Sequence, residues 1–281
     1  MRDMEGRTVF ITGASRGIGA AMALRCAEAG ANVVIAAKTA DPHPKLPGTI
    51  YSVAEECEKS GGRALPLRMD LRNVEEIEAT VEKAAKHFGG IDVLINNASA
   101  QTFTKTPDTT PKQFDLMFDI NVRGTFFASQ ACIPHLRKSA NPQILIVASA
   151  MSPDPRWYAE RLPRTMSKYG MSMCVIGLAE EFKEEGIAVN GIWPRHAIAT
   201  AAIRATRPEM YETCRRPAIM ADAAHWIVTR SRRSITGRFF FDDEALSEAG
   251  KSAAEIDGYW ITPGKQSPLS SFIDFDKRPV R

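Results

Sequence analysis

Short apolar runs alternate along the chain with longer stretches in which apolar residues recur at helical spacing. The longer stretches, among them Val74–Phe88, Pro111–Leu136 and Thr165–Glu185, predict amphipathic helices. Alternation of this kind predicts βαβ units, and therefore a parallel sheet with helices on both faces. The predicted strands are Val9–Thr12, Asn32–Ala36, Ala64–Leu67, Asp92–Asn96, Ile144–Ala148, Ala188–Ile192 and Arg238–Phe241.

The pattern predicts an α/β fold: a Rossmann-type, doubly wound sheet of about seven strands. One domain is expected over residues 1–264, followed by a tail over residues 265–281 without a core of its own. Three irregular segments, Thr39–Thr49, Ala150–Pro163 and Trp193–Pro217, follow the second, fifth and sixth strands. Ligands bind at the carboxyl ends of the strands in such sheets, so these three segments are expected to border the site.

A glycine-rich loop follows the first predicted strand and opens the first helix. Glycine has no Cβ, so the turn can be sharp and the backbone can approach a pyrophosphate closely. The helix then directs unpaired N–H groups and its positive dipole end at the anion. The loop therefore predicts a nucleotide site, with cofactor contacts from Gly13, Ser15, Arg16, Gly17, Ile18 and Gly19.

The end of the second strand indicates which nicotinamide cofactor is bound. An NAD site carries an acidic residue about 20 positions after the loop, where it holds the ribose 2′-hydroxyl. Here the residue 19 positions after Gly19 is Lys38. Lys38 together with Arg16 suits a 2′-phosphate and favours NADP over NAD. The alternative is that both are solvated surface charges.

Composition bears on four further questions: nucleic-acid binding, cellular compartment, metal binding and membrane insertion. The 281 residues are 44% hydrophobic and 25% charged, with a formal net charge of +3, which gives no reason to expect nucleic acid. The five cysteines are scattered and contain no CxxC pair, which predicts free thiols and a reducing, cytoplasmic location. The five histidines are equally scattered, so no metal site is expected. Neither a signal peptide nor a membrane span is expected.

The chain resembles the short-chain dehydrogenase/reductase family in its TGxxxGxG loop and in Asn96-Asn97-Ala98-Ser99 after the fourth strand. The resemblance implies that Asp70 accepts a hydrogen bond from the adenine amino group. It also implies that Asn97 braces the sheet edge and that Ala98 lets the cofactor pass closely. Family members transfer hydride between a nicotinamide and a carbonyl or hydroxyl carbon, using an Asn-Ser-Tyr-Lys set.

Three members of that set have matches, and one does not. Asn121 matches the asparagine, Ser149 the serine (with Ser152 as the second choice), and Lys168 the lysine, which also holds the nicotinamide ribose. The tyrosine should lie one helical turn before Lys168, where this chain has Arg164.

Arg164 decides how the reaction is interpreted. A guanidinium is a poor proton shuttle near pH 7, but it can stabilise an alkoxide as a fixed charge. The proton would then come from water or from Tyr158, while Tyr169 is expected to face elsewhere. The alternatives are a cofactor-binding pseudoenzyme and a substitution introduced by mutagenesis.

Further cations fall in the two segments expected around the substrate: Arg156, Arg161, Arg164, Arg195 and His196. If they converge, the pocket suits a carboxylate or an acyl-CoA phosphate. The other interpretation is that two or three of them face solvent.

Longer strings, from about Gly6 to Gly264, resemble the hydroxysteroid dehydrogenase-like branch of the second type. Longer members append a sterol-carrier domain, for which this chain is too short. The resemblance implies an NADP-dependent oxidoreductase acting on a small or lipid-like (sterol or fatty-acyl) carbonyl substrate. The alternative is an NADP-binding pseudoenzyme that serves as a sensor or assembly subunit. Members of the family commonly form dimers or tetramers, so a homodimer or homotetramer is expected.

Overall fold

A computed structural model describes residues 2–44, 46–159, 161–232 and 234–270. Its strands form a single parallel sheet in the order β3-β2-β1-β4-β5-β6-β7. This confirms the predicted doubly wound α/β fold. The strands are β1 Thr8–Thr12, β2 Asn32–Ala37, β3 Arg63–Arg68, β4 Val93–Asn96, β5 Gln143–Ile146, β6 Ala188–Trp193 and β7 Phe239–Phe241.

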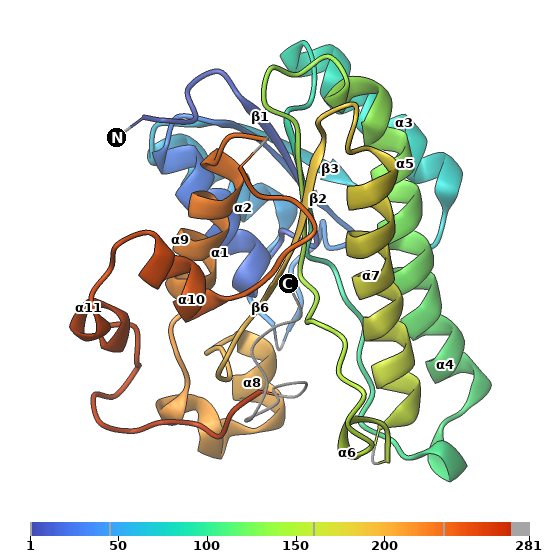
Figure 1. The fold of residues 1–281 in the computed structure, drawn as a ribbon, viewed down its shortest axis with the longest axis vertical. Helices are drawn as coiled ribbons and strands as arrows, with labels where there is room; N and C mark the ends of the chain where they lie inside the picture. The colour runs from blue at the N-terminus through green and yellow to red at the C-terminus, as the bar shows by residue number, and fades with distance from the viewer. Residues whose placement is uncertain (1, 45, 160, 233, 271–281) are drawn as a thin grey trace.

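Helices cover both faces of the sheet, because the central strands are apolar on both sides. Every residue of β1 and β2 is buried, as expected for strands covered by helices on both faces. One face carries α1 (Gly17–Glu28), α2 (Ile50–Lys59) and α9 (Ala218–Thr229) (Figure 1). The other carries α3 (Val74–Phe88), α5 (Gly124–Leu136) and α7 (Leu162–Glu181). Each face has its own apolar cluster.

The strand order reverses next to β1, which pairs with both β2 and β4. At such a reversal the following loops diverge to opposite faces and leave a crevice at the carboxyl edge of the sheet. The glycine loop leaves β1 there, and residues 97–99 leave β4 beside it. The crevice therefore lies where the glycine loop predicts a nucleotide site.

The predicted helix Pro111–Leu136 is not one regular helix. It consists of α4 (Pro111–Met117), a π-helical turn (Phe118–Arg123) and α5. Asn121 lies in the wide turn, a feature often found at functional sites. Local periodicity could not show it, since the apolar pattern continues through the turn.

Other boundaries also differ from the prediction. Helix α7 begins at Leu162 rather than Thr165, because Pro163 is tolerated in a first helical turn, and it ends at Glu181 rather than Glu185. Strand β5 ends at Ile146, two residues before Ala148. The irregular segments contain three short helical pieces: α6 (Arg156–Ala159), α8 (Ala201–Thr206) and a 3-10 turn (Pro208–Thr213).

After β7 the chain forms α10 (Asp242–Glu248) and α11 (Ala253–Asp257) and returns to the carboxyl edge. The Ala197 N–H donates to Ser267 Oγ at 3.2 Å, and the Ser270 N–H donates to the Arg195 carbonyl at 2.8 Å. Ser267 and Ser270 of the predicted tail therefore hydrogen-bond to the loop after β6. Residues 271–281 of that tail lie outside the described part of the chain.

Candidate active site

Two adjoining cavities occupy the carboxyl edge of the sheet. The first, of about 410 Å³, lies over the glycine loop and the ends of β2 and β3. The second, of about 820 Å³, lies between the segments that follow β5 and β6. They share a wall formed by Ile18, Asn97, Ser99, Thr200 and Ala202, so a ligand in one borders the other.

The glycine loop has the geometry that a pyrophosphate requires. Gly13 and Gly17 adopt φ of +67° and +58°, a region in which other residues are strained. A Cβ on Gly19 would come within 2.4 Å of Asn97 Nδ2 and 2.6 Å of the Gly13 carbonyl. Helix α1 begins with no side-chain capping bond and no acidic residue in its first turn. Its first N–H groups are therefore available to an anion.

Asn97 holds this loop in place. Its Nδ2 donates to the carbonyls of Thr12 at 3.0 Å and Gly13 at 3.1 Å, and its backbone N–H donates to Thr12 Oγ1. The asparagine thus ties the end of β4 to the end of β1. Ala98, the next residue, lines the first cavity.

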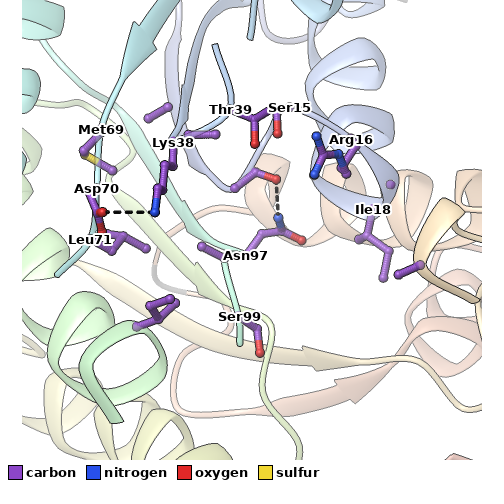
Figure 2. A pocket seen from close by; sticks show the side chains of 18 of the residues that line it. Ser15, Arg16, Ile18, Lys38, Thr39, Met69, Asp70, Leu71, Asn97 and Ser99 are labelled. Atoms are coloured by element: carbon purple, nitrogen blue, oxygen red, sulfur yellow. Dashed lines mark hydrogen bonds and ion pairs between the residues drawn. The ribbon is translucent and has the colours of Figure 1, made fainter. Parts of the chain in front are cut away.

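Charged side chains line the far end of the first cavity, where the 2′ group of an adenosine ribose is expected. Lys38 Nζ lies 3.7 Å from Asp70 Oδ2 and its side chain is 63% exposed (Figure 2). Arg72 Nη2 donates to the same oxygen at 2.5 Å, and this bond is the main reason that the pKa of Asp70 is lowered to about 2. Arg16 lines the cavity too, but its guanidinium donates to the Pro47 and Gly48 carbonyls.

Arg72 could not be predicted as a lining residue, because its spacing from the motif residues carries no signal. Only the fold brings it beside Lys38. With Arg16, Lys38 and Arg72 against Asp70, the described lining of the first cavity has an excess of positive charge.

Asn121 is buried and makes three hydrogen bonds through its side chain. Its Oδ1 accepts from the Ala100 N–H at 2.8 Å, and its Nδ2 donates to the Ala100 carbonyl at 2.8 Å and Ser167 Oγ at 3.0 Å. Ser167 in turn donates to the Arg164 carbonyl at 3.0 Å. Both amide protons are used, so the side chain positions the loop after β4 against the start of α7.

Lys168 and Arg164 both line the second cavity from α7. Lys168 is 1% exposed, its Nζ lies 3.5 Å from the Val147 carbonyl, and it sits 5.4 Å from the centre of the Trp193 ring. Burial, followed by the charge of Arg164, lowers the pKa of Lys168 to about 7. Arg164 Nε donates to Gln101 Oε1 at 2.9 Å. Burial, then Arg161 and Arg207, lower its pKa to about 10.

The predicted hydroxyl donors lie away from the described lining of the second cavity. Ser149 Oγ is buried and has no hydrogen-bond partner among the described residues. The Tyr158 hydroxyl donates to the Ser152 carbonyl at 2.7 Å, and the Tyr169 hydroxyl accepts from the Ser152 N–H at 3.1 Å. Tyr158 and Tyr169 meet edge to face with ring centres 5.7 Å apart. Ser152, the second choice, accepts from the Asp154 N–H at 3.1 Å.

Of the five cationic residues predicted around the substrate, three line the second cavity. Arg156, Arg161 and Arg164 line the second cavity, and Arg207 joins them from the segment after β6. Arg195 instead pairs with Asp243 at 2.8 Å and Glu244 at 2.7 Å, while His196 Nδ1 lies 2.8 Å from the Ser267 carbonyl. Arg195 and His196 are both absent from the described lining.

Other features of the described residues bear on the remaining expectations. The five cysteines carry free thiols. Within the described ranges, no group of three or more His, Cys, Asp or Glu side chains is placed to hold a metal ion. The same ranges contain no helix that combines the length and the apolar character needed to cross a membrane.

Comparison with known proteins places the chain among its relatives. The bovine hydroxysteroid dehydrogenase-like protein 2 is 51% identical over 278 residues, which are 99% of this chain and 65% of that protein. The human protein of the same name is 52% identical over 272 residues, covering 96% and 64%. The chain therefore spans about two thirds of the length of these relatives.

Solved structures of other dehydrogenases and oxidoreductases share the fold of this chain. A short chain dehydrogenase from Mycobacterium thermoresistibile is 42% identical, with a TM-score of 0.91 and 98% of both chains covered. Two more distant neighbours, at 23% and 24% identity, share the fold with TM-scores of 0.72 and 0.71. One, from Mycobacterium paratuberculosis, is bound to NAD, and the other, a metagenomic oxidoreductase, is in complex with NADP. They cover 87% and 85% of this chain, and 99% and 98% of their own.

The family model described as short chain dehydrogenase matches residues 7–210, which hold the glycine loop, Asn121 and Lys168. The chain belongs to the short-chain dehydrogenase/reductase family of oxidoreductases, whose members bind nicotinamide cofactors.

Proposed function

We propose that the protein is an NADP-dependent oxidoreductase that transfers hydride between the nicotinamide and a carbonyl or hydroxyl carbon of a small or lipid-like substrate. The observation that carries the proposal is the wall shared by the two cavities. This wall supports the proposal because the cavity over the glycine loop adjoins the larger cavity that contains Lys168. The chemistry that a bound nicotinamide cofactor would supply is hydride transfer.

NADP is favoured over NAD by charge. The strand end that carries an acid in NAD sites carries Lys38, and Arg72 lies close enough to share Asp70 with it. Lys38 is exposed, and its ammonium lies 3.7 Å from the Asp70 carboxylate, so it can turn to a 2′-phosphate. The pyrophosphate would be held by the N-terminus of α1, and the adenine would lie near Asp70.

The proton is assigned to Lys168. Reduction of a carbonyl needs a proton on the oxygen as hydride reaches the carbon. With arginine at the tyrosine position, Lys168 is the buried group of the second cavity whose pKa, about 7, suits proton release near neutral pH. Arg164 is assigned as a fixed positive charge that stabilises the developing alkoxide. Tyr158 and Ser149 are less suited, since neither lines the cavity in its described part.

A pseudoenzyme is the second candidate, and specific observations favour it. The tyrosine is absent, the Ser149 hydroxyl does not line the cavity, and the Asn121 amide is fully engaged. Under this alternative the chain binds NADP as a sensor or assembly subunit without turning over a substrate.

One pair of measurements separates the candidates. NADPH binding is measured by calorimetry, and NADPH oxidation is measured against a panel of ketones, aldehydes and acyl thioesters. Oxidoreductase function predicts turnover, and it predicts a gain of about 10²-fold on Arg164→Tyr, because a positioned phenol adds an acid one helical turn from Lys168. Binding without turnover in both proteins identifies the pseudoenzyme. Absence of NADPH binding rejects both candidates.

We also propose that the protein is a homodimer or homotetramer and works in the cytoplasm, where its free thiols stay reduced. Large apolar side chains are exposed on α5 and α7, notably Phe126 at 44%, Met173 at 61% and Ile176 at 47%. A second copy would cover them. Analytical ultracentrifugation tests this, and Met173→Glu is expected to shift the species toward the monomer.

A further inference from the structure

Three arginines, two from the start of α7 and one from the segment after β6, surround one aromatic ring at the second cavity. The ring is Phe103, which follows β4 and is 53% exposed. The guanidinium carbons of Arg161, Arg164 and Arg207 lie 5.1, 5.6 and 5.1 Å from its centre. All four residues line the cavity.

Like charges placed this close repel one another. The charges of Arg161 and Arg207 act on Arg164, where they add to the effect of burial in lowering its pKa. Among the described residues, neither Arg161 nor Arg207 forms an ion pair, and the described lining of the cavity includes no Asp or Glu. Phe103 attracts the cations through its face but accepts no conventional hydrogen bond, so this contact does not occupy the N–H donors of Arg161 and Arg207.

The rest of the cavity is largely apolar. Its walls include the rings of Trp157 and Trp193 and the side chains of Ile198, Ile203 and Leu269. A volume of about 820 Å³ is in the range that holds ligands of drug size. The cavity thus combines a concentrated positive charge at Phe103 with an apolar wall that runs toward Lys168.

We infer that the arginines around Phe103 form an anion site, so that the substrate of this cavity is an amphipathic anion: a carboxylate or phosphate attached to an apolar chain. The inference rests on the proposed function for the reaction, but the anion site itself needs no cofactor. Guanidinium groups bind both anions through paired N–H donors, so a carboxylic acid and a phosphorylated carrier are recognised by the same chemistry.

The test is a binding titration of the full chain without NADPH, followed by tryptophan fluorescence, because Trp157 and Trp193 line the cavity. The probes are decanoate, decyl phosphate and decan-1-ol, which share an apolar chain and differ in charge. We expect both anions, or one of them, to bind at least about tenfold more tightly than the alcohol, with the advantage falling as salt rises. The tighter anion identifies the source: decanoate a free acid, decyl phosphate a phosphorylated carrier.

Arg161→Gln/Arg207→Gln is expected to reduce the anion advantage to less than about threefold. The matched control is Arg204→Gln, since Arg204 stacks on Tyr211 at 4.1 Å and is absent from the described lining. If the double variant does not fold, Arg207→Gln alone gives the same comparison. Equal binding of anions and alcohol, or an advantage that survives the arginine substitutions, overturns the inference. NADPH calorimetry on the same samples separates this outcome from failure of the proposed function.

Discussion

The two cavities of the carboxyl edge are built in different ways. The first depends on backbone: glycines with positive φ, an uncapped helix start, and an asparagine that ties two strand ends together. The second depends on long side chains from three separate segments, with four arginines and one lysine in its described lining. Backbone requirements leave a readable pattern in sequence, whereas side chains that meet across segments leave almost none. The first cavity could therefore be predicted from motif residues, and the second cavity only in part.

The largest expected effect is at Lys168. Lys168→Met keeps the length of the side chain and removes its proton, so carbonyl reduction should fall by about 10³-fold. Lys183→Met, at an exposed site beyond α7, is the control and should leave the rate unchanged. A fall of less than about threefold at Lys168 would assign the proton to another donor.

The pH dependence of the reduction rate also tests whether Lys168 donates the proton. Reduction needs the ammonium form, so the rate should decline above about pH 7, where Lys168 loses its proton. Arg164→Gln removes one cause of the lowered pKa and should move that decline to higher pH. A profile that is flat from pH 6 to 9 contradicts this role.

The pH dependence of the folding stability gives an independent test of the lowered pKa of Lys168. The pKa of Lys168 is about 7 in the folded protein and near its ordinary 10.5 in the unfolded chain. Between those values the unfolded chain binds more protons, so the contribution of Lys168 to stability rises with pH. The Tm of the native protein relative to Lys168→Met should therefore increase from pH 7 to pH 10. Parallel Tm curves for the two proteins would show that folding does not lower the pKa of Lys168.

The next effect concerns the backbone of the first cavity. Gly19→Ala would push a methyl group against Asn97 and the Gly13 carbonyl, and displacement of the loop should weaken NADPH binding about 100-fold. Gly177→Ala, in α7 with open space at its Cβ, is the matched control and should bind NADPH normally. Calorimetry measures both, and circular dichroism reports whether each is folded. Normal binding by Gly19→Ala would show that the loop tolerates a side chain.

Lys38 tests the choice of cofactor. Lys38→Asp should weaken NADPH binding by about 1.5–3 kcal/mol, which is roughly 10- to 100-fold, and leave NADH binding little changed or improved. Lys59→Asp, at an exposed site on the outside of α2, controls for net charge. Equal affinity of the native protein for NADPH and NADH would contradict the assignment.

Much of this architecture follows from local sequence. The alternation of apolar runs predicted all seven strands, and the pattern is strongest at β1, β2 and β4, whose residues are all buried. The glycine spacing predicted the loop, because few residues tolerate its φ values. The π-helical turn around Asn121 could not be predicted, because α4, the turn and α5 share one helical pattern of apolar residues. Arg72 and Arg207 were hidden for another reason: neither belongs to a motif, and only the crossing of segments brings them to the cavities.

Ser149 is the position where motif and geometry disagree most, and its test has the smallest expected effect. Its hydroxyl is buried and lacks a partner among the described residues, a state that costs about 1–3 kcal/mol. Ser149→Ala should therefore raise the Tm by a few degrees and change turnover less than about threefold. Ser172→Ala is the contrasting variant, because Ser172 Oγ donates to the Ser149 carbonyl at 2.6 Å and its loss should lower the Tm. A 10²-fold loss of turnover in Ser149→Ala would mean that the hydroxyl reaches the substrate once the cofactor is bound, and the second cavity would then contain the family's serine after all.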